Sequence, residues 1–191
     1  MSQTATEWPR RHRLTVEDYY RMGEAGILRP DERVELIEGE IIDMAPIGTR
    51  HSAAVDQLAA LLHGALGDKA IVRCQNPVSI DDHSEAEPDF ALLRRRSDFY
   101  RTAHPRPHDL LLIIEVAESS LAYDRDVKVP LYARHGVPEV WLIDLEGRCV
   151  TRYRTPADGA YTRVDEPPLE VALGIGSLAE ASVELGRLFT G

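Results

Sequence analysis

The sequence contains few of the residues on which several common classes of protein depend. Its two cysteines, Cys74 and Cys149, lie in separate apolar segments and not in a CxxC pair, so a cysteine metal site is not expected. A disulfide between them is the alternative to their acting as small buried hydrophobes. A Walker loop, a GxGxxG motif and a nucleophile elbow are also absent, which gives no basis for a P-loop NTPase, a dinucleotide enzyme or an α/β-hydrolase.

Long apolar segments are equally scarce. The longest apolar run, residues 110–114, is far too short to span a bilayer, and the N-terminus has no signal peptide, so we expect no membrane contact and a cytoplasmic location. With 191 residues and 43% hydrophobic residues, the chain can form a proper core without disulfides. We expect a flexible arm over residues 1–13 and a single domain over residues 14–191.

Lysine is rare and acid is abundant. The chain has 32 acidic and 22 basic residues, and only Lys69 and Lys128 are lysines, which makes each lysine more informative. A net charge of −10 opposes nucleic-acid binding, which requires a basic surface, but a metal-dependent nuclease needs carboxylates at its centre. The best candidate for a basic strip is the segment 94–96 with Arg101 and Arg106, and a solvated loop is the alternative.

The order of expected elements predicts an α/β (α+β) fold. Thr15 caps a helix that ends near Gly26, Glu38-Gly39 joins a β-hairpin over residues 33–37 and 40–44, and a second helix runs from Thr49 or Ser52 to Gly67. We expect further strands at residues 70–73, 77–80, 89–93, 110–116, 139–143, 149–154 and 161–164, and a third helix at residues 126–135. The result is a central mixed, largely antiparallel sheet flanked by helices, with an apolar C-terminal tail packed on the core or on a second subunit.

Two acidic residues are the strongest candidates for chemistry. Pro88 precedes Asp89 where a strand begins, and Glu115 interrupts an unbroken apolar run, where a carboxylate is costly unless it is paired or binds a cation. If the two strands are neighbours, the carboxylates could hold Mg²⁺ or Mn²⁺, which take oxygen ligands and keep several waters. The alternative is a buried salt bridge between Glu115 and an arginine.

A helical segment supplies a second group of candidates. Asp124, Lys128 and Tyr132 follow i, i+4 spacing and are expected to share one helix face. Since Pro130 favours a helix start just before it, we expect Lys128 in or near a first helical turn. The helix dipole disfavours a cation there, so a nearby site of carboxylates would explain the placement of Lys128. The alternative is a surface salt bridge between Lys128 and Asp124.

Glu35 and His51 are weaker candidates. Glu35 lies among apolar residues and is expected on the face of its strand that points away from the core. His51 opens the second helix, where it could line the site or serve as a surface or cap-region histidine.

Six short motifs occur in order along the chain: Val34-Glu35-Leu36-Ile37-Glu38-Gly39-Glu40, His51, Pro88-Asp89, Ile114-Glu115-Val116, Asp124-Arg125-Asp126-Val127-Lys128-Val129-Pro130-Leu131-Tyr132 and Gly136-Val137-Pro138-Glu139-Val140-Trp141. Singly these motifs are weak; the ordered set covers roughly residues 14–155. Taken together, they resemble the Uma-two family, whose members are assigned to the PD-(D/E)XK nuclease superfamily as restriction endonucleases.

The resemblance implies a restriction-endonuclease-like fold and Mg²⁺-dependent (or Mn²⁺-dependent) hydrolysis of DNA by a homodimer, with Asp89 and Glu115 as metal ligands. The superfamily places a lysine two residues after the second acid, where this chain has Ala117, so Lys128 is the candidate to supply the amine. Glu35, His51, Asp124 and Tyr132 would support the site. The alternatives are a nuclease-fold binding or assembly module without strong catalysis, and a hydrolase of another phosphate ester.

Overall fold

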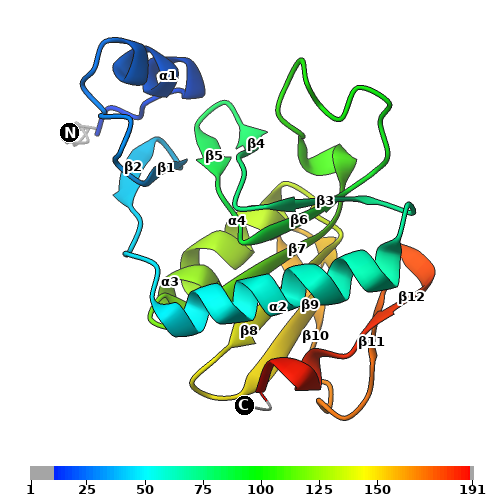
Figure 1. Ribbon diagram of the computed structural model, residues 1–191. Helices are drawn as coiled ribbons and strands as arrows, with labels where there is room; N and C mark the ends of the chain where they lie inside the picture. The colour runs from blue at the N-terminus through cyan, green and yellow to red at the C-terminus, as the bar shows by residue number, and fades with distance from the viewer. Residues whose placement is uncertain (1–10, 190–191) are drawn as a thin grey trace, which may run out of the picture.

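A six-stranded sheet forms the centre of the computed structural model, which describes residues 11–189 (Figure 1). Its strand order is β10-β9-β8-β7-β6-β3, and β7 and β8 run parallel while all other neighbours are antiparallel, as the sequence predicted. The expected arm falls mostly on residues 1–10, outside the described residues. The strands are β3 (Ile71–Cys74), β6 (Phe90–Leu93), β7 (Leu110–Ala117), β8 (Glu139–Asp144), β9 (Cys149–Ala157) and β10 (Ala160–Asp165).

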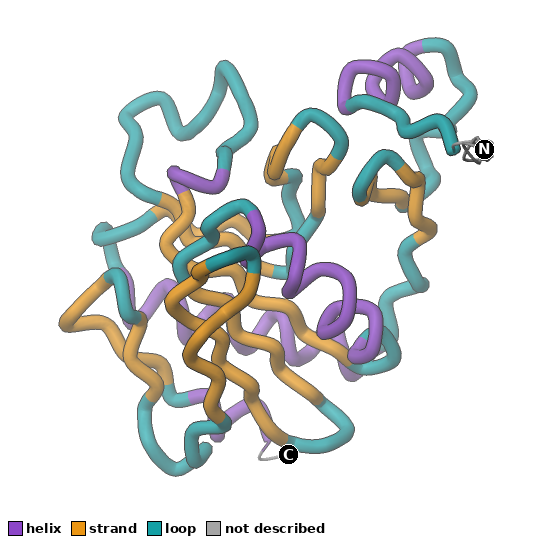
Figure 2. The backbone as a smooth tube through the Cα atoms, turned by 180° about the vertical axis from the view of Figure 1, so that it is seen from behind, coloured by secondary structure: helices purple, strands orange, loops and turns teal. Residues whose placement is uncertain are grey.

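Helices cover both faces of this sheet. The long helix α2 (Thr49–Leu66) packs on one face together with the C-terminal hairpin β11 (Leu173–Ile175) and β12 (Leu178–Val183) and the 3₁₀ turn η3 (Leu185–Phe189). The opposite face carries α3 (Leu121–Tyr123), η2 (Asp124–Lys128) and α4 (Val129–Arg134), which lie in front of the sheet when it is viewed from behind (Figure 2). Residues of β7 contribute to both hydrophobic clusters, as expected of a strand that is buried on both faces.

A smaller four-stranded sheet lies beside the central one, with the order β2-β1-β5-β4 (Figure 1). It contains the predicted hairpin β1 (Val34–Ile37) and β2 (Glu40–Asp43), then β4 (Val78–Asp81) and the short β5 (Ser84–Ala86), which the sequence did not predict. Helix α1 (Val16–Glu24) begins with the expected Thr15 cap, a reciprocal capping box with Asp18, and buries none of its residues. The 3₁₀ turn η1 (Pro107–Asp109) precedes β7.

The third helix begins earlier than the sequence predicted. The helical run starts at Leu121, not at residue 126, and contains a π turn in which the Val129 N–H donates to the Asp124 carbonyl. This wider turn comes just before Pro130, whose ring would meet the carbonyl four residues earlier in a regular α-helix. Lys128 therefore lies in the middle of a helical run, and the prediction that places it in a first turn is wrong.

The remaining expectations for the fold concern the tail and the cysteines. Leu173, Ile175, Val183 and Phe189 belong to the core cluster on the α2 face, so the apolar tail packs on its own chain. Both cysteines are free. Within residues 11–189, no helix is both long enough and apolar enough to cross a bilayer.

Candidate active site

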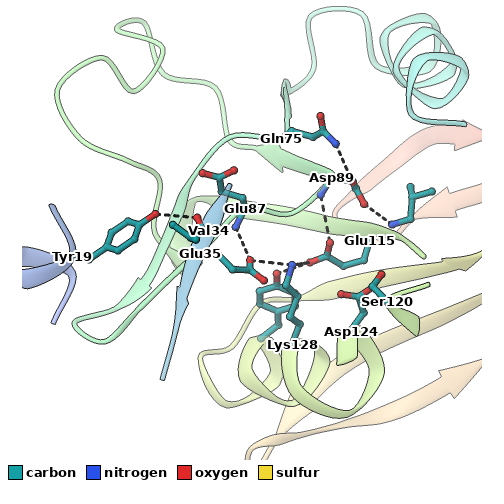
Figure 3. A network of polar contacts seen from close by, with 12 residues as sticks. Tyr19, Val34, Glu35, Gln75, Glu87, Asp89, Glu115, Ser120, Asp124 and Lys128 are labelled. Carbon is teal, nitrogen blue, oxygen red and sulfur yellow. Dashed lines mark hydrogen bonds and ion pairs between the residues drawn. The ribbon is translucent and has the colours of Figure 1, made fainter. Parts of the chain in front are cut away.

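Asp89 and Glu115 lie across from each other at one end of two neighbouring strands. Phe90 pairs with Ile114 in the antiparallel β6–β7 ladder, so the residues one step further, Asp89 and Glu115, are opposite one another. The Asp89 N–H donates to Oε2 of Glu115 at 3.4 Å, and the Val116 N–H donates to Oδ2 of Asp89 at 2.8 Å. Both carboxylates line the same pocket (Figure 3), so the expected convergence of these two residues is present in the structure.

Glu115 is almost completely enclosed. It is 2% exposed, and its Oε1 accepts a hydrogen bond from the Tyr132 hydroxyl at 2.6 Å and lies 3.4 Å from Nζ of Lys128. Burial raises the pKa of Glu115 to about 8, although the charge of Lys128 acts in the opposite direction. The partner is thus a lysine with a tyrosine, and the alternative of a buried salt bridge to an arginine is wrong.

Lys128 joins two elements that are distant in the chain. Its Nζ lies 3.1 Å from Oε2 of Glu35 on β1 as well as near Glu115, and its side chain is only 6% exposed. Burial alone would lower the pKa of Lys128, but the carboxylates of Glu115, Glu35 and Asp124 outweigh it and raise that pKa. The alternative of a surface salt bridge with Asp124 is therefore wrong.

Glu35 and Asp124 complete the buried acidic group. Every residue of β1 is buried, and Glu35 points into the pocket, where its Oε2 also accepts the Glu87 N–H at 3.2 Å. Asp124 accepts a hydrogen bond from the Ser120 hydroxyl at 2.5 Å, and burial raises the pKa of this carboxyl group. Asp124, Lys128 and Tyr132 are all buried in this region, as their i, i+4 spacing predicted.

Asp89 is held from the other side by His51 and Gln75. Nε2 of His51, in the first turn of α2, lies 3.3 Å from both oxygens of Asp89, and the Gln75 amide donates to Oδ1 at 3.1 Å. Burial would raise the pKa of Asp89, but the hydrogen bonds from His51, Val116 and Gln75 lower it. The same bond raises the pKa of His51, which lines the pocket with its side chain 16% exposed and is not a surface histidine.

Several residues of the pocket were not predicted from the sequence. Gln75 and Glu87 flank short strands, and Ser120 and Tyr123 precede or begin the helical run; none belongs to a spacing pattern that suggests a site. The one available signal is that Gln75 stands just before Asn76-Pro77, a turn sequence, and it adopts a left-handed φ of 48°. The Tyr123 hydroxyl is buried and has no hydrogen-bond partner among the residues that the structure describes.

The pocket has a volume of about 330 Å³ and a strong excess of acid. Seven carboxylates line it, against one arginine and one lysine. Within the described part of the chain, no group of three or more His, Cys, Asp or Glu residues is arranged to hold a metal ion. The donor set therefore does not fit a closed zinc cage; it fits Mg²⁺ or Mn²⁺, which two carboxylates and several waters can hold.

The expected basic strip is not part of this pocket. Arg94 donates to the His108 carbonyl, Arg95 pairs with Asp68 at 2.9 Å and Arg96 pairs with Asp98 at 2.7 Å. These arginines follow the far end of β6, and none of them lines the pocket. The segment therefore lies apart from the pocket, and its role as a basic strip stays a prediction.

Comparison with solved structures supports the fold. The chain is similar to a crystal structure from Anabaena variabilis ATCC 29413, titled a putative nuclease belonging to DUF820, with a TM-score of 0.69 and 18% sequence identity over 92% of this chain and 97% of that one. The fold is restriction-endonuclease-like, as predicted. A search of curated proteins gave no match. A family model named Uma2 and described as "Putative restriction endonuclease" matches residues 16–181, most of the chain, and the protein therefore belongs to the Uma2 family.

Proposed function

We propose that the protein is a metal-dependent endonuclease that hydrolyses phosphodiester bonds of DNA. The observation that carries the proposal is the meeting of Asp89 and Glu115, 26 residues apart in the chain, beside the buried ammonium group of Lys128. Family membership supports nuclease chemistry. A divalent cation also accounts for the excess of carboxylates, because it would offset their repulsion and that between the pocket and a phosphate.

Asp89 and Glu115 would hold Mg²⁺ or Mn²⁺, which supplies an activated water and charge stabilisation for the phosphate when it is bound. Deprotonated carboxylates are required for this, and a cation would favour the charged form of Glu115, whose pKa burial raises to about 8. His51 and Gln75 would keep Asp89 oriented, since each donates to that carboxylate.

Lys128 acts in this proposal as a fixed positive charge. Because the surrounding carboxylates raise its pKa, it stays an ammonium ion at neutral pH and is unsuited to take a proton from water. It would instead orient the attacking water or stabilise charge that develops on the phosphate. Glu35 and Tyr132 support it, Glu35 by direct pairing and Tyr132 by holding the shared partner Glu115.

The test compares Asp89→Asn with Asp158→Asn. Asp158 is exposed in the β9–β10 turn, where its φ of 51° suits asparagine, so this control removes one carboxylate far from the pocket. Plasmid, linear and single-stranded DNA, and RNA, are incubated with each protein in Mg²⁺ or Mn²⁺. We expect metal-dependent cutting by the control and a loss of about a hundredfold or more in Asp89→Asn. Equal cutting by both variants would refute the proposed role of Asp89.

A second candidate is a nuclease-fold binding or assembly module without catalysis. It is favoured by Ala117, a buried residue at the position of the superfamily's lysine, and by the fact that every oxygen of Asp89 and Glu115 already has a protein partner. Calorimetry distinguishes the two candidates: metal binding with no cutting of any substrate supports the module and contradicts the nuclease.

The proposal also includes a homodimer, a single domain over residues 14–191 and a cytoplasmic location. Sedimentation at micromolar concentration tests the dimer, and limited proteolysis tests the domain. Cell fractionation tests the location.

A further inference from the structure

The pocket has an apolar wall as well as its acidic residues. Residues 44–48 connect β2 to α2, and Met44, Ala45, Pro46 and Ile47 all line the pocket. Ile47 is 43% exposed, which makes it one of the few large hydrophobic side chains of the described residues that are open to solvent. An exposed apolar segment at the wall of a functional pocket indicates contact with an apolar part of a ligand.

This segment runs close to the loop that follows β7. A Cβ atom added at Gly48 would lie 2.9 Å from Oε2 of Glu118, so the two chain segments approach closely at this point. Both residues line the pocket. The apolar segment is therefore a wall of a bounded cavity of about 330 Å³, near the lower end of the volumes typical of small-ligand pockets.

Arg33 brings a cation to the same pocket. It is exposed, and among the described residues it forms no ion pair within 4.0 Å. Its guanidinium group donates one long hydrogen bond, 3.5 Å from Nη1 to the carbonyl of Ala45 in the apolar wall. Lys128, by contrast, is buried between Glu35 and Glu115, so Arg33 is the pocket residue suited to meet an anion from solvent.

These features suit one nucleotide better than a duplex. Duplex binding relies on many phosphate contacts to a basic surface, whereas seven carboxylates line this pocket and the arginines of segment 94–96 pair elsewhere. In a duplex the faces of the bases are stacked and cannot reach an apolar wall. An unpaired nucleotide offers such a face next to a phosphate, the combination that single-strand sites recognise.

We propose that the pocket takes one unpaired nucleotide of a nucleic-acid strand, with Arg33 paired to its backbone phosphate and residues 44–47 packed against its base. The protein then prefers single strands and unpaired ends to intact duplex. This inference rests on the proposed nuclease function and adds the substrate class.

Binding is measured first, by fluorescence anisotropy in Ca²⁺, with a labelled oligothymidylate of about twelve nucleotides and a duplex of the same length. We expect the single strand to bind at least about tenfold more tightly. Cutting of the same two probes is then measured in Mg²⁺ and Mn²⁺.

Two pairs of variants locate the contacts. Arg33→Ala is compared with Arg163→Ala, and Ile47→Ser with Val164→Ser, because Arg163 and Val164 are similarly exposed on β10 and do not line the pocket. Loss of one phosphate contact should reduce the slope of log K against log salt by about 0.7 in Arg33→Ala. Ile47→Ser should weaken binding about fivefold with little change in slope. Both β10 variants should bind like the wild type.

The outcomes separate the inference from the function on which it rests. Equal or tighter binding of duplex, or equal effects in the pocket and β10 variants, overturns the inference even if the protein cuts DNA. Preferential binding of single strands without any cutting supports the inference and contradicts the nuclease function. Failure of the wild-type protein to bind either probe overturns both.

Discussion

Replacement of Lys128 by methionine tests the buried charge network directly. The substitution keeps an unbranched side chain but removes the ammonium group that lies 3.1 Å from Glu35 and 3.4 Å from Glu115. Both carboxylates are then left in a site where each side chain is 3% exposed and where no other lysine or arginine of residues 11–189 forms an ion pair with them. We expect the free energy of unfolding of the metal-free protein to fall by about 3–5 kcal/mol at pH 8, the usual cost of breaking a buried pair by removing one partner.

The loss should depend on pH in a defined direction. Without Lys128 the pKa of Glu115 in the folded variant rises still further above that in the unfolded chain, because the charged form has lost its counter-ion. Stability relative to wild type is then greatest where both folded proteins bind the Glu115 proton, and it decreases as the pH rises from about 8, the pKa of Glu115 in the wild type, toward the higher pKa of the variant. Mn²⁺ added at pH 8 should restore part of the loss, because it would supply positive charge in the same pocket.

Urea unfolding at pH 5, pH 8 and about pH 9, with and without Mn²⁺, measures these changes. Lys69→Met is the matched control: its ammonium group is 46% exposed and pairs with Glu180 at 3.8 Å, so its removal should cost less than about 1 kcal/mol at each pH. If the two variants lose the same small amount at pH 8, the reasoning about buried charge is wrong.

Three further variants test other contacts. Tyr123→Phe should leave the stability unchanged or higher, since it removes a buried hydroxyl that has no partner among the described residues. Tyr161→Phe should lower the free energy of unfolding by about 1 kcal/mol, because its hydroxyl donates to a backbone carbonyl at 2.9 Å. Calorimetry that ranks the two variants the other way contradicts this reasoning. Two arginines of β9 lower the pKa of Asp165, so this carboxylate stabilises the folded protein above its unfolded pKa, and that stabilisation is lost as the pH falls through the folded pKa. Asp165→Asn should therefore lower the free energy of unfolding by up to about 1 kcal/mol near pH 7 and by nothing in strong acid. A cost that does not change with pH would argue against the ion pairs. Glu139→Gln should speed hydrogen exchange in the C-terminal hairpin, because the buried carboxylate accepts the Gly176 N–H at 2.7 Å; unchanged exchange there would exclude this anchoring role.

Local sequence signals predicted most of the fold because local physics decides those elements. Thr15 caps its helix, Glu38-Gly39 turns the hairpin with both residues at positive φ, and Gly67 ends α2. Strand β5 was missed because three residues, Ser84–Ala86, carry no recognisable alternation, and it exists through pairing with β1 and β4. The π turn was missed for a related reason: its hydrogen bond spans five residues and leaves no pattern beyond Pro130.

Residues of the candidate site could be predicted from the sequence where a residue does not suit its local sequence context. Glu115 stands out because a carboxylate within a buried strand requires a partner, and Lys128 stands out because lysine is rare in this chain. Gln75 and Tyr123 cause no such conflict in the sequence and become visible only in three dimensions. The cluster of arginines at residues 94–96 is conspicuous in the sequence, yet none of them lines the pocket.

The position of Lys128 shows that the fold of this chain keeps a positive charge next to Glu115, although not at the position of the superfamily's lysine. On β7, residues 115 and 117 point to the same face, and a lysine at position 117 would reach the pocket along the strand that carries Glu115. In this chain that position holds a fully buried alanine, and the ammonium group comes instead from a helical run packed on the same face, where a π turn precedes Pro130. The contact between Lys128 and Glu115 therefore depends on how the helix packs against the sheet and not on strand register. A search for a motif of fixed spacing misses such a contact. The contact can instead be predicted from the energetic need to neutralise two buried carboxylates.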